Sequence, residues 1–227
     1  MAKKDTPMLQ VQAYEYLKEL IKNDDLDPDK FYSLNQMAKE HGFSRTPFRD
    51  AVLRLEQERY IDIYPSKGFK LHAMTREDMV ETYQMRGAIE SYCLKELSRG
   101  LDTERGQQYY EKITGKVRLQ REIMNTTGDP EDFGRKDYEF HRSIVQYVGN
   151  RVMLEIYRQF MYRIFWLNVS SFSRKGRMQE AVEEHERFLS LIREKDLAGL
   201  DDLLNHHLSV PRAINVDLVG TSENNPA

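Results

Sequence analysis

Residues 43–69 read FSRTPFRDAVLRLEQERYIDIYPSKGF, and this stretch determines how the first third of the chain folds. Its first half has apolar side chains at helical spacing, at Phe48, Ala51, Val52 and Leu55, which leaves the opposite face polar. Its second half alternates apolar and polar residues in YIDIY, turns at PSKG and alternates back in FKLH. The stretch therefore predicts an amphipathic helix followed by a two-stranded hairpin.

Two more helices are expected before this one. Apolar side chains recur on one helical face across residues 8–23. Ser33 and Gln36 have the spacing of a capping box at the start of a short second helix, and Gly42 suits the left-handed turn that ends it. Three helices with a tight turn between the last two, followed by a hairpin, predict a winged helix-turn-helix, whose third helix enters the DNA major groove.

Arg45 and Arg49 are the candidate base-reading side chains. They stand four residues apart near the positive end of the third helix, so they share one face. They could instead be solvated surface charges, but the apolar residues already account for the inward face, and a wing turn with Lys67 and Gly68 follows. Residues 44–72 also carry six Lys or Arg against four Asp or Glu, in a chain whose net charge is −3.

The same stretch resembles the N-terminal domain of GntR-family bacterial transcription regulators. The recognition-helix signature is matched by Ser44-Arg45-Thr46-Pro47, Arg49-Asp50-Ala51 and Arg54-Leu55, and the wing by Lys67-Gly68-Phe69. The resemblance implies that DNA is contacted by Ser44, Arg45, Thr46, Arg49, Lys67 and Gly68. The chain departs from the family at Arg59, where a glycine is usual, and at Asn35, where many relatives have an arginine. These departures bear on the operator sequence rather than on DNA binding itself.

The rest of the chain is expected to be helical, because only Pro130 occurs between Pro65 and Pro211 and apolar residues recur at helical spacing. The expected helices cover residues 76–98, 105–126, 131–147, 151–172, 178–194 and 197–213. The fold class is therefore mainly α, a winged helix-turn-helix followed by an all-α antiparallel bundle. The expected divisions are residues 1–73, 74–215 and a disordered tail, 216–227.

Composition excludes several classes of protein. The mean hydropathy is −0.71, and no apolar run approaches the ~18 residues that span a bilayer. The N-terminus is basic but has no apolar segment of the kind found in secretory signals. Cys93 is the only cysteine, which excludes an intrachain disulfide and a multi-thiolate metal site. We therefore expect a cytoplasmic protein.

Four side chains of the helical part are candidates for one metal site. Asp137 and His141 are four residues apart, on one helical face. His185 and His207 lie on the last two helices, which a short connection folds back antiparallel, so both can point into one interior. One carboxylate and three imidazoles suit Zn²⁺, Ni²⁺ or Mn²⁺. The alternative is that these are buried histidines that only make hydrogen bonds.

The helical part also resembles a known domain, the FCD-type ligand-binding domain of FadR-like GntR regulators. Its D-x-x-F-H element is matched by residues 137–141, and its closing pattern by Glu184-His185, Asp196 and His207-Leu208. The resemblance implies a divalent metal, zinc first, on Asp137, His141, His185 and His207, with His206 pointing elsewhere.

Arg86 and Glu90 match the R-x-x-x-E of the first helix of that domain. The resemblance implies that Arg86 lies near an effector cavity, where it can pair with a carboxylate. The alternative for Arg86 is a structural salt bridge with Glu90.

Together these features predict a bacterial transcription regulator that is not an enzyme. A homodimer would bind a pseudo-palindromic operator, and a small organic acid would modulate the affinity. One alternative is a sensor for which the metal itself is the signal. Another is a metal-dependent hydrolase, but the chain has neither an HExxH nor a G-x-S-x-G motif to supply a base or nucleophile.

Overall fold

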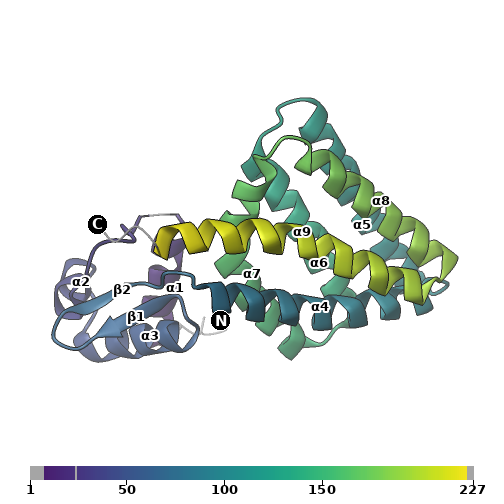
Figure 1. The fold of residues 1–227 in the computed structure, drawn as a ribbon. Coiled ribbons are helices and arrows are strands. Elements are labelled where there is room, and N and C mark those ends of the chain that lie inside the picture. The colour runs from purple at the N-terminus through teal and green to yellow at the C-terminus, as the bar shows by residue number, and fades with distance from the viewer. Residues whose placement is uncertain (1–7, 24, 224–227) are drawn as a thin grey trace, which may run out of the picture. The chain divides into compact units, whose positions relative to one another are not determined.

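The computed structural model describes residues 8–23 and 25–223, which form two compact units, one up to Ala73 and one from Met74 onward. The first unit contains three helices and a hairpin (Figure 1). Its elements are α1 (Leu9–Lys22), α2 (Leu34–Glu40), α3 (Arg45–Gln57), β1 (Ile61–Tyr64) and β2 (Gly68–Leu71). The strands pair antiparallel, with Ile61 opposite Leu71. This order confirms the predicted winged helix-turn-helix.

The core of the first unit follows the predicted pattern. Phe48, Ala51, Val52 and Leu55 are all buried on α3, which packs against α1. The wing is fixed by backbone contact, because Gly68 has a φ of 108° and a Cβ there would lie 2.1 Å from the Tyr32 carbonyl oxygen. Only glycine allows this close approach.

The second unit is a bundle of six helices among the described residues, in agreement with the predicted fold class. They are α4 (Arg76–Arg99), α5 (Glu104–Asn125), α6 (Pro130–Val148), α7 (Arg151–Phe172), α8 (Arg177–Glu194) and α9 (Leu197–Glu223). α4 lies beside α9, and α5 beside α6 and α8 (Figure 1). No helix within the described residues has both the length and the apolar character needed to cross a membrane.

Local chemistry sets the helix ends. Thr75 and Asp78 form a capping box at the start of α4. The Asp129 side chain accepts from two backbone N–H groups at the start of α6, where Pro130 occupies the first turn. Gly149 ends α6 in the left-handed conformation, with a φ of 76°.

The end of the chain corrects one expectation. We expected the last helix to stop at residue 213 and residues 216–227 to be disordered, but α9 continues to Glu223. The reason is a buried anchor near the end of the helix, because the Asn215 side chain is fully buried and donates to Tyr83 Oη at 2.9 Å and to Asn168 Oδ1 at 3.1 Å. Pro211 removes one helical hydrogen bond without ending the helix. Residues 224–227 of the expected tail lie outside the described residues.

Candidate metal centre and DNA-reading helix

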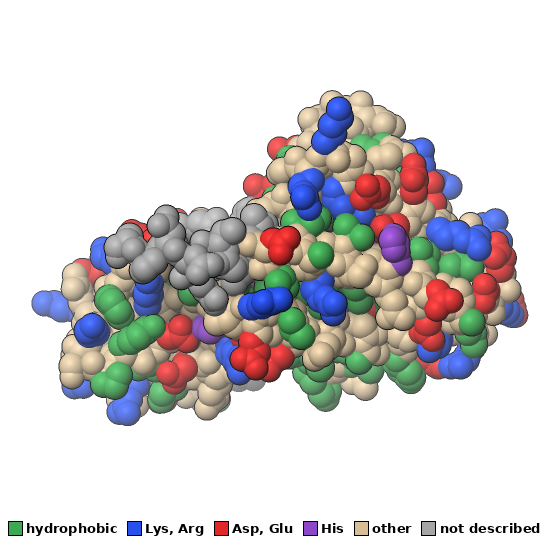
Figure 2. Space-filling view, in the orientation of Figure 1, with side chains coloured by type: hydrophobic (Ala, Val, Ile, Leu, Met, Phe, Trp, Pro, Cys, Tyr) green, Lys and Arg blue, Asp and Glu red, His purple; other side chains and the backbone are tan. Residues whose placement is uncertain are grey.

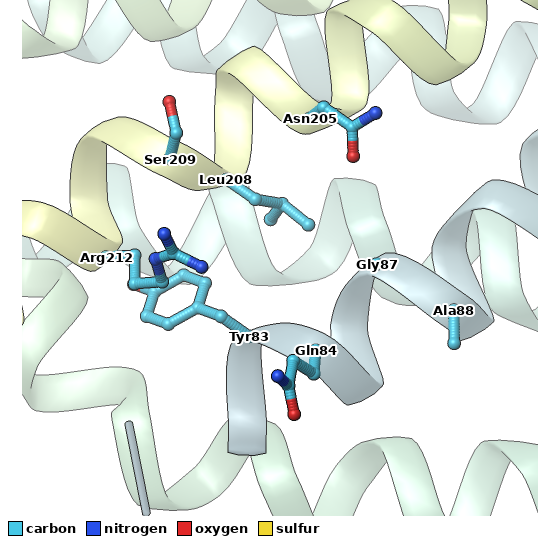
Figure 3. Close-up of a pocket in the computed structure, with 8 residues that line it drawn as sticks. All are labelled: Tyr83, Gln84, Gly87, Ala88, Asn205, Leu208, Ser209 and Arg212. Carbon is cyan, nitrogen blue, oxygen red and sulfur yellow. The ribbon is translucent and has the colours of Figure 1, made fainter. Parts of the chain in front are cut away.

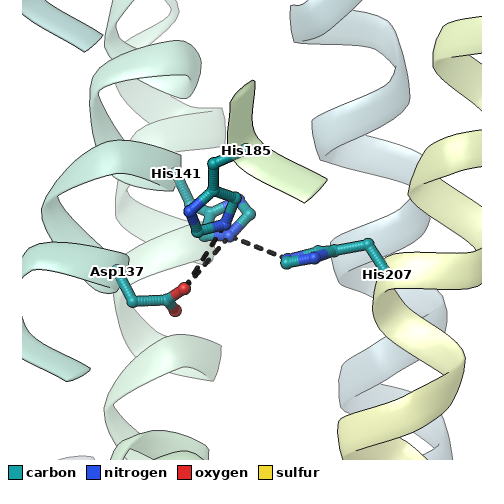
Figure 4. A group of neighbouring side chains, drawn as sticks. All are labelled: Asp137, His141, His185 and His207. Atoms are coloured by element: carbon teal, nitrogen blue, oxygen red, sulfur yellow. Dashed lines mark hydrogen bonds and ion pairs between the residues drawn. The ribbon is translucent and has the colours of Figure 1, made fainter. Parts of the chain in front are cut away.

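Asp137, His141, His185 and His207 converge inside the bundle (Figure 4). α6 supplies the aspartate and the first histidine, and α8 and α9 supply one histidine each. All four side chains are buried, and one ligand atom from each lies within 4.8 Å of the others. The His141 and His207 Nε2 atoms are 3.1 Å apart, and Asp137 Oδ1 lies 3.5 Å from His185 Nε2 and 3.7 Å from His141 Nε2. The structure thus brings together all four predicted residues.

The Nδ1 atom of each histidine has a partner on the side away from the cluster. His141 Nδ1 lies 2.8 Å from Glu90 Oε2, and His207 Nδ1 lies 2.5 Å from Glu184 Oε2. An ionised carboxylate only accepts hydrogen bonds, so His207 Nδ1 donates to Glu184 Oε2, and the lone pair of His207 Nε2 faces the centre of the cluster. The Nε2 atoms of His141 and His207 are close enough to each other to ligate a single cation.

His185 is held in the same way by an amide. Its Nδ1 lies 2.8 Å from Oε1 of Gln120, a fully buried residue of α5. Sequence reasoning missed the roles of Gln120 and Glu184. The only signal for Glu184 was its position next to His185 in the sequence. Gln120 gave no signal, because nothing in the sequence indicates that α5 packs against α8.

The electrostatic environment favours neutral imidazoles, the form that binds metals. Burial lowers the pKa of His185 well below its ordinary value, and the nearby His207 and His141 lower it further. Burial also lowers the pKa of His207, although its hydrogen bond to Glu184 acts in the opposite direction. Burial opposes ionisation of Glu184, but hydrogen bonds from His207 and Arg177 lower its pKa to about 2.

Two buried arginines lie next to the cluster. Arg86 Nε donates to Glu90 Oε1 at 2.8 Å, so the salt bridge considered from the sequence is present. Arg177, on α8, makes a two-pronged contact to Glu184, at 3.1 and 3.0 Å. Arg86 Nη2 and Arg177 Nε are buried and have no hydrogen-bond partner among the described residues.

A small cavity is lined by both of these arginines and by two residues of the cluster. Its lining consists of Arg86, Asp137, Asn168, Ser171, Phe172, Arg177, His207 and Pro211. Its volume of about 10 Å³ is room for one water molecule. Arg86 therefore borders this cavity and also forms the salt bridge to Glu90. An acid larger than water requires the cavity to expand.

An open groove of about 390 Å³ runs between α4 and α9 on the surface (Figure 3). Tyr83 lines the groove, and its hydroxyl donates a 2.8 Å hydrogen bond to Asn168, which lines the small cavity. The Arg86 guanidinium lies 5.7 Å from the centroid of the Tyr83 ring. Tyr83 thus lines the open groove and also hydrogen-bonds to a side chain that lines the small cavity.

His206 lies outside the cluster, as expected. Its side chain is 65% exposed, and its Nε2 is 3.8 Å from Glu184 Oε1.

The candidate DNA-reading side chains are exposed on the first unit. Ser44, Arg45, Thr46 and Arg49 are all solvent-exposed at the N-terminal end of α3, and Ser44 makes no side-chain capping hydrogen bond. Lys67 is exposed in the wing turn. Figure 2 shows Lys and Arg side chains protruding from this unit. These side chains are free to meet a DNA surface.

Comparison with known proteins assigns both units. Residues 9–71 match the family model "Bacterial regulatory proteins, gntR family", and residues 81–210 match the FCD domain. The protein belongs to the GntR family and carries an FCD domain. It is a transcriptional regulator with a DNA-binding domain, and the resemblance inferred from the sequence is confirmed.

Relatives of this GntR-family regulator include the HTH-type transcriptional repressor GlaR of Escherichia coli K12. The two are 19% identical over 210 residues, which cover 88% of this chain and 93% of GlaR. E. coli McbR/YncC has a similar fold, with a TM-score of 0.70 and 19% identity over 94% of this chain and 99% of that one. The metal-free FCD domain of another regulator is similar with a TM-score of 0.52 and 21% identity, over 66% of this chain and 99% of that one.

Proposed function

We propose that this GntR-family regulator binds a divalent metal and a small carboxylate in its FCD domain, and that the carboxylate modulates operator affinity. The observation that carries the proposal is the convergence of Asp137, His141, His185 and His207 in a buried site.

The four residues fit a metal ion well. Their ligand atoms are one oxygen and three nitrogens, the set that suits zinc, with nickel and manganese as the alternatives. The outward partners of the three Nδ1 atoms leave each Nε2 directed at one point. A bound divalent cation would supply positive charge and an open coordination position for a carboxylate oxygen.

Arg86 is the proposed anchor for the acid. Arg86 lines the small cavity, and its buried Nη2 has no hydrogen-bond partner among the described residues. An unpaired guanidinium N–H in an apolar interior is costly, and a carboxylate satisfies it. Glu90 neutralises the charge of Arg86 and leaves this N–H free.

For the DNA, we propose that Arg45 and Arg49 read base edges in the major groove. Ser44 and Thr46 would contact phosphates, and Lys67 with the Gly68 amide would place the wing on the backbone or in the minor groove. The binding unit is proposed to be a homodimer on a pseudo-palindromic operator, in which the acid changes the placement of the two DNA-binding domains.

Elemental analysis and native mass spectrometry of protein purified without added metal test the metal and the co-purifying ligand. We expect about one metal ion per chain and much less in His185→Ala. Equal metal content in the two preparations would reject the site. If metal removal alone changes operator affinity and no carboxylic acid has an effect, the metal-sensor alternative is correct.

The variant Arg86→Lys tests the anchor. Lysine keeps the charge beside Glu90 but lacks the second guanidinium nitrogen. We expect near-normal stability without ligand and a reduced thermal shift across a panel of small carboxylic acids. An unchanged thermal shift would show that Arg86 is only the salt-bridge partner of Glu90.

A further inference from the structure

Each arginine at the small cavity begins a series of three residues in contact, and each series ends at a candidate metal ligand. In the first series, the Arg177 guanidinium contacts both oxygens of Glu184, and Glu184 Oε2 lies 2.5 Å from His207 Nδ1. Arg177 is 3% exposed and Glu184 is 9% exposed, so water does little to screen either charge. Gly176, with a φ of 86°, makes the sharp turn immediately before Arg177.

The second series has the same three residue types on different helices, but its contact between glutamate and histidine is an ion pair without a recorded hydrogen bond. Arg86 Nε donates to Glu90 Oε1 at 2.8 Å, and Glu90 Oε2 lies 2.8 Å from His141 Nδ1. Arg86 is 2% exposed and Glu90 is 1% exposed. Two separate helix pairs thus bring the same three residue types together in the same order. His185 differs, since its partner is the uncharged Gln120.

In each series, the glutamate and the arginine change the strength of metal binding in opposite directions. A carboxylate that accepts the Nδ1 hydrogen makes the imidazole a stronger donor at Nε2 and fixes its orientation. An arginine on that carboxylate neutralises it, and its own positive charge opposes a cation nearby.

We propose that Glu184 and Glu90 are positioning residues that strengthen metal binding through His207 and His141, and that Arg177 and Arg86 weaken it by neutralising those carboxylates. The proposal rests on the metal site of the proposed function and assigns four residues outside the ligand set to the control of its affinity. A purely structural salt bridge would behave differently, because removal of either partner would destabilise the fold and leave the metal affinity unchanged.

The test is the zinc affinity of the full-length protein, measured by competition with a chromogenic chelator at fixed pH and salt. We expect Glu184→Gln to lower the affinity about 10- to 100-fold. We expect Arg177→Met to raise it by at least about threefold, because a buried positive charge near the cation is removed. Arg177→Lys keeps the charge and should remain near the wild-type value. The ¹⁵N chemical shifts of the His207 ring give an independent readout of which nitrogen carries the hydrogen.

Lys95 and Asp201 provide a matched control. They form a 2.6 Å ion pair between α4 and α9, and neither touches the cluster, so Lys95→Met and Asp201→Asn should leave zinc affinity unchanged. If Arg177→Met does not fold, the variants Arg86→Met and Glu90→Gln test the same inference in the second series of residues.

Two results would overturn the inference while leaving the proposed function intact. One is wild-type zinc binding with no change in Glu184→Gln, and the other is a loss of affinity in Arg177→Met similar to that in Glu184→Gln. A wild-type protein that binds no metal would overturn both.

Discussion

At the scale of single residues, Arg49 gives the clearest prediction for DNA binding. Loss of one base-reading arginine costs ~1–3 kcal/mol, so Arg49→Ala should weaken operator binding roughly 5- to 150-fold at fixed salt. Arg54 is the control on the same helix, because it is committed to Glu58 at 2.9 Å and its guanidinium stacks 3.8 Å from the Tyr14 ring centroid. Arg54→Ala should change operator affinity little. Equal losses in the two variants, measured by fluorescence anisotropy, would reject base reading by Arg49.

The buried histidines predict a pH dependence of stability. The pKa of His185 and that of His207 are lowered in the folded protein, so the unfolded chain takes up protons first as the pH falls. The stability that they contribute is therefore complete above the unfolded value of ~6.5 and is lost as the pH falls below it.

Thermal melts of chelator-treated protein between about pH 7.5 and 5.5 check this dependence. The melting temperature should fall toward the acid end, and His207→Gln should weaken that dependence. The exposed neighbour His206 serves as control, and His206→Gln should retain it. A constant melting temperature across the range would contradict the prediction.

The four candidate ligands could be predicted from the sequence, but their surroundings could not. Asp137 and His141 share a helical face by their spacing, and His185 and His207 lie on the last two helices. The resemblance to the FCD domain then assigned all four to one metal site. Gln120 is different, because its contact with His185 joins α5 to α8 and depends on how those two helices pack in the bundle. Side-chain contacts between packed helices leave no recognisable pattern in a single amino-acid sequence.

At the scale of elements, the turn between α3 and β1 is strained. Arg59 has a φ of 56°, a left-handed conformation that costs a side-chain-bearing residue ~1–2 kcal/mol, whereas glycine adopts it freely. Arg59→Gly should therefore stabilise the winged-helix unit by about 0.5–1 kcal/mol, after the greater flexibility of glycine in the unfolded chain is deducted. Gln57→Gly, two residues earlier at the exposed end of α3, should instead destabilise it by about 0.5–1 kcal/mol. Denaturant melts that move both variants in the same direction would contradict this explanation.

Helix starts were predictable because their caps are local. Asp129 with Pro130 and Gly149 mark both ends of α6 within the sequence itself. The end of α9 was missed, because Pro211 and the polar residues after it indicate a stop. The contact that extends the helix joins Asn215 to Tyr83, 132 positions away along the chain. Signals within one helical turn can be read from the sequence, and contacts across the bundle cannot.

At the scale of the whole molecule, the two compact units predict two separable responses to metal. A ligand that binds only the folded FCD domain stabilises it by RT ln(1 + [L]/Kd), ~2.7 kcal/mol at a hundredfold excess over Kd. For a unit of this size that amounts to a rise in melting temperature of about 5–10 °C. The metal ligands all lie in the unit from Met74 onward, whereas the wing and α3 lie in the other.

Differential scanning calorimetry with and without zinc tests this prediction. Zinc should raise the transition of the FCD domain and leave that of the winged-helix unit within about 1 °C, and an operator duplex should do the reverse. The combined substitution of His185 and His207 by alanine should abolish the zinc effect and retain the operator effect. If zinc raised both transitions equally in the absence of DNA, the units would unfold together, and a metal signal could pass to the DNA-binding unit through stability alone. If zinc raised neither transition, the metal site would be wrong.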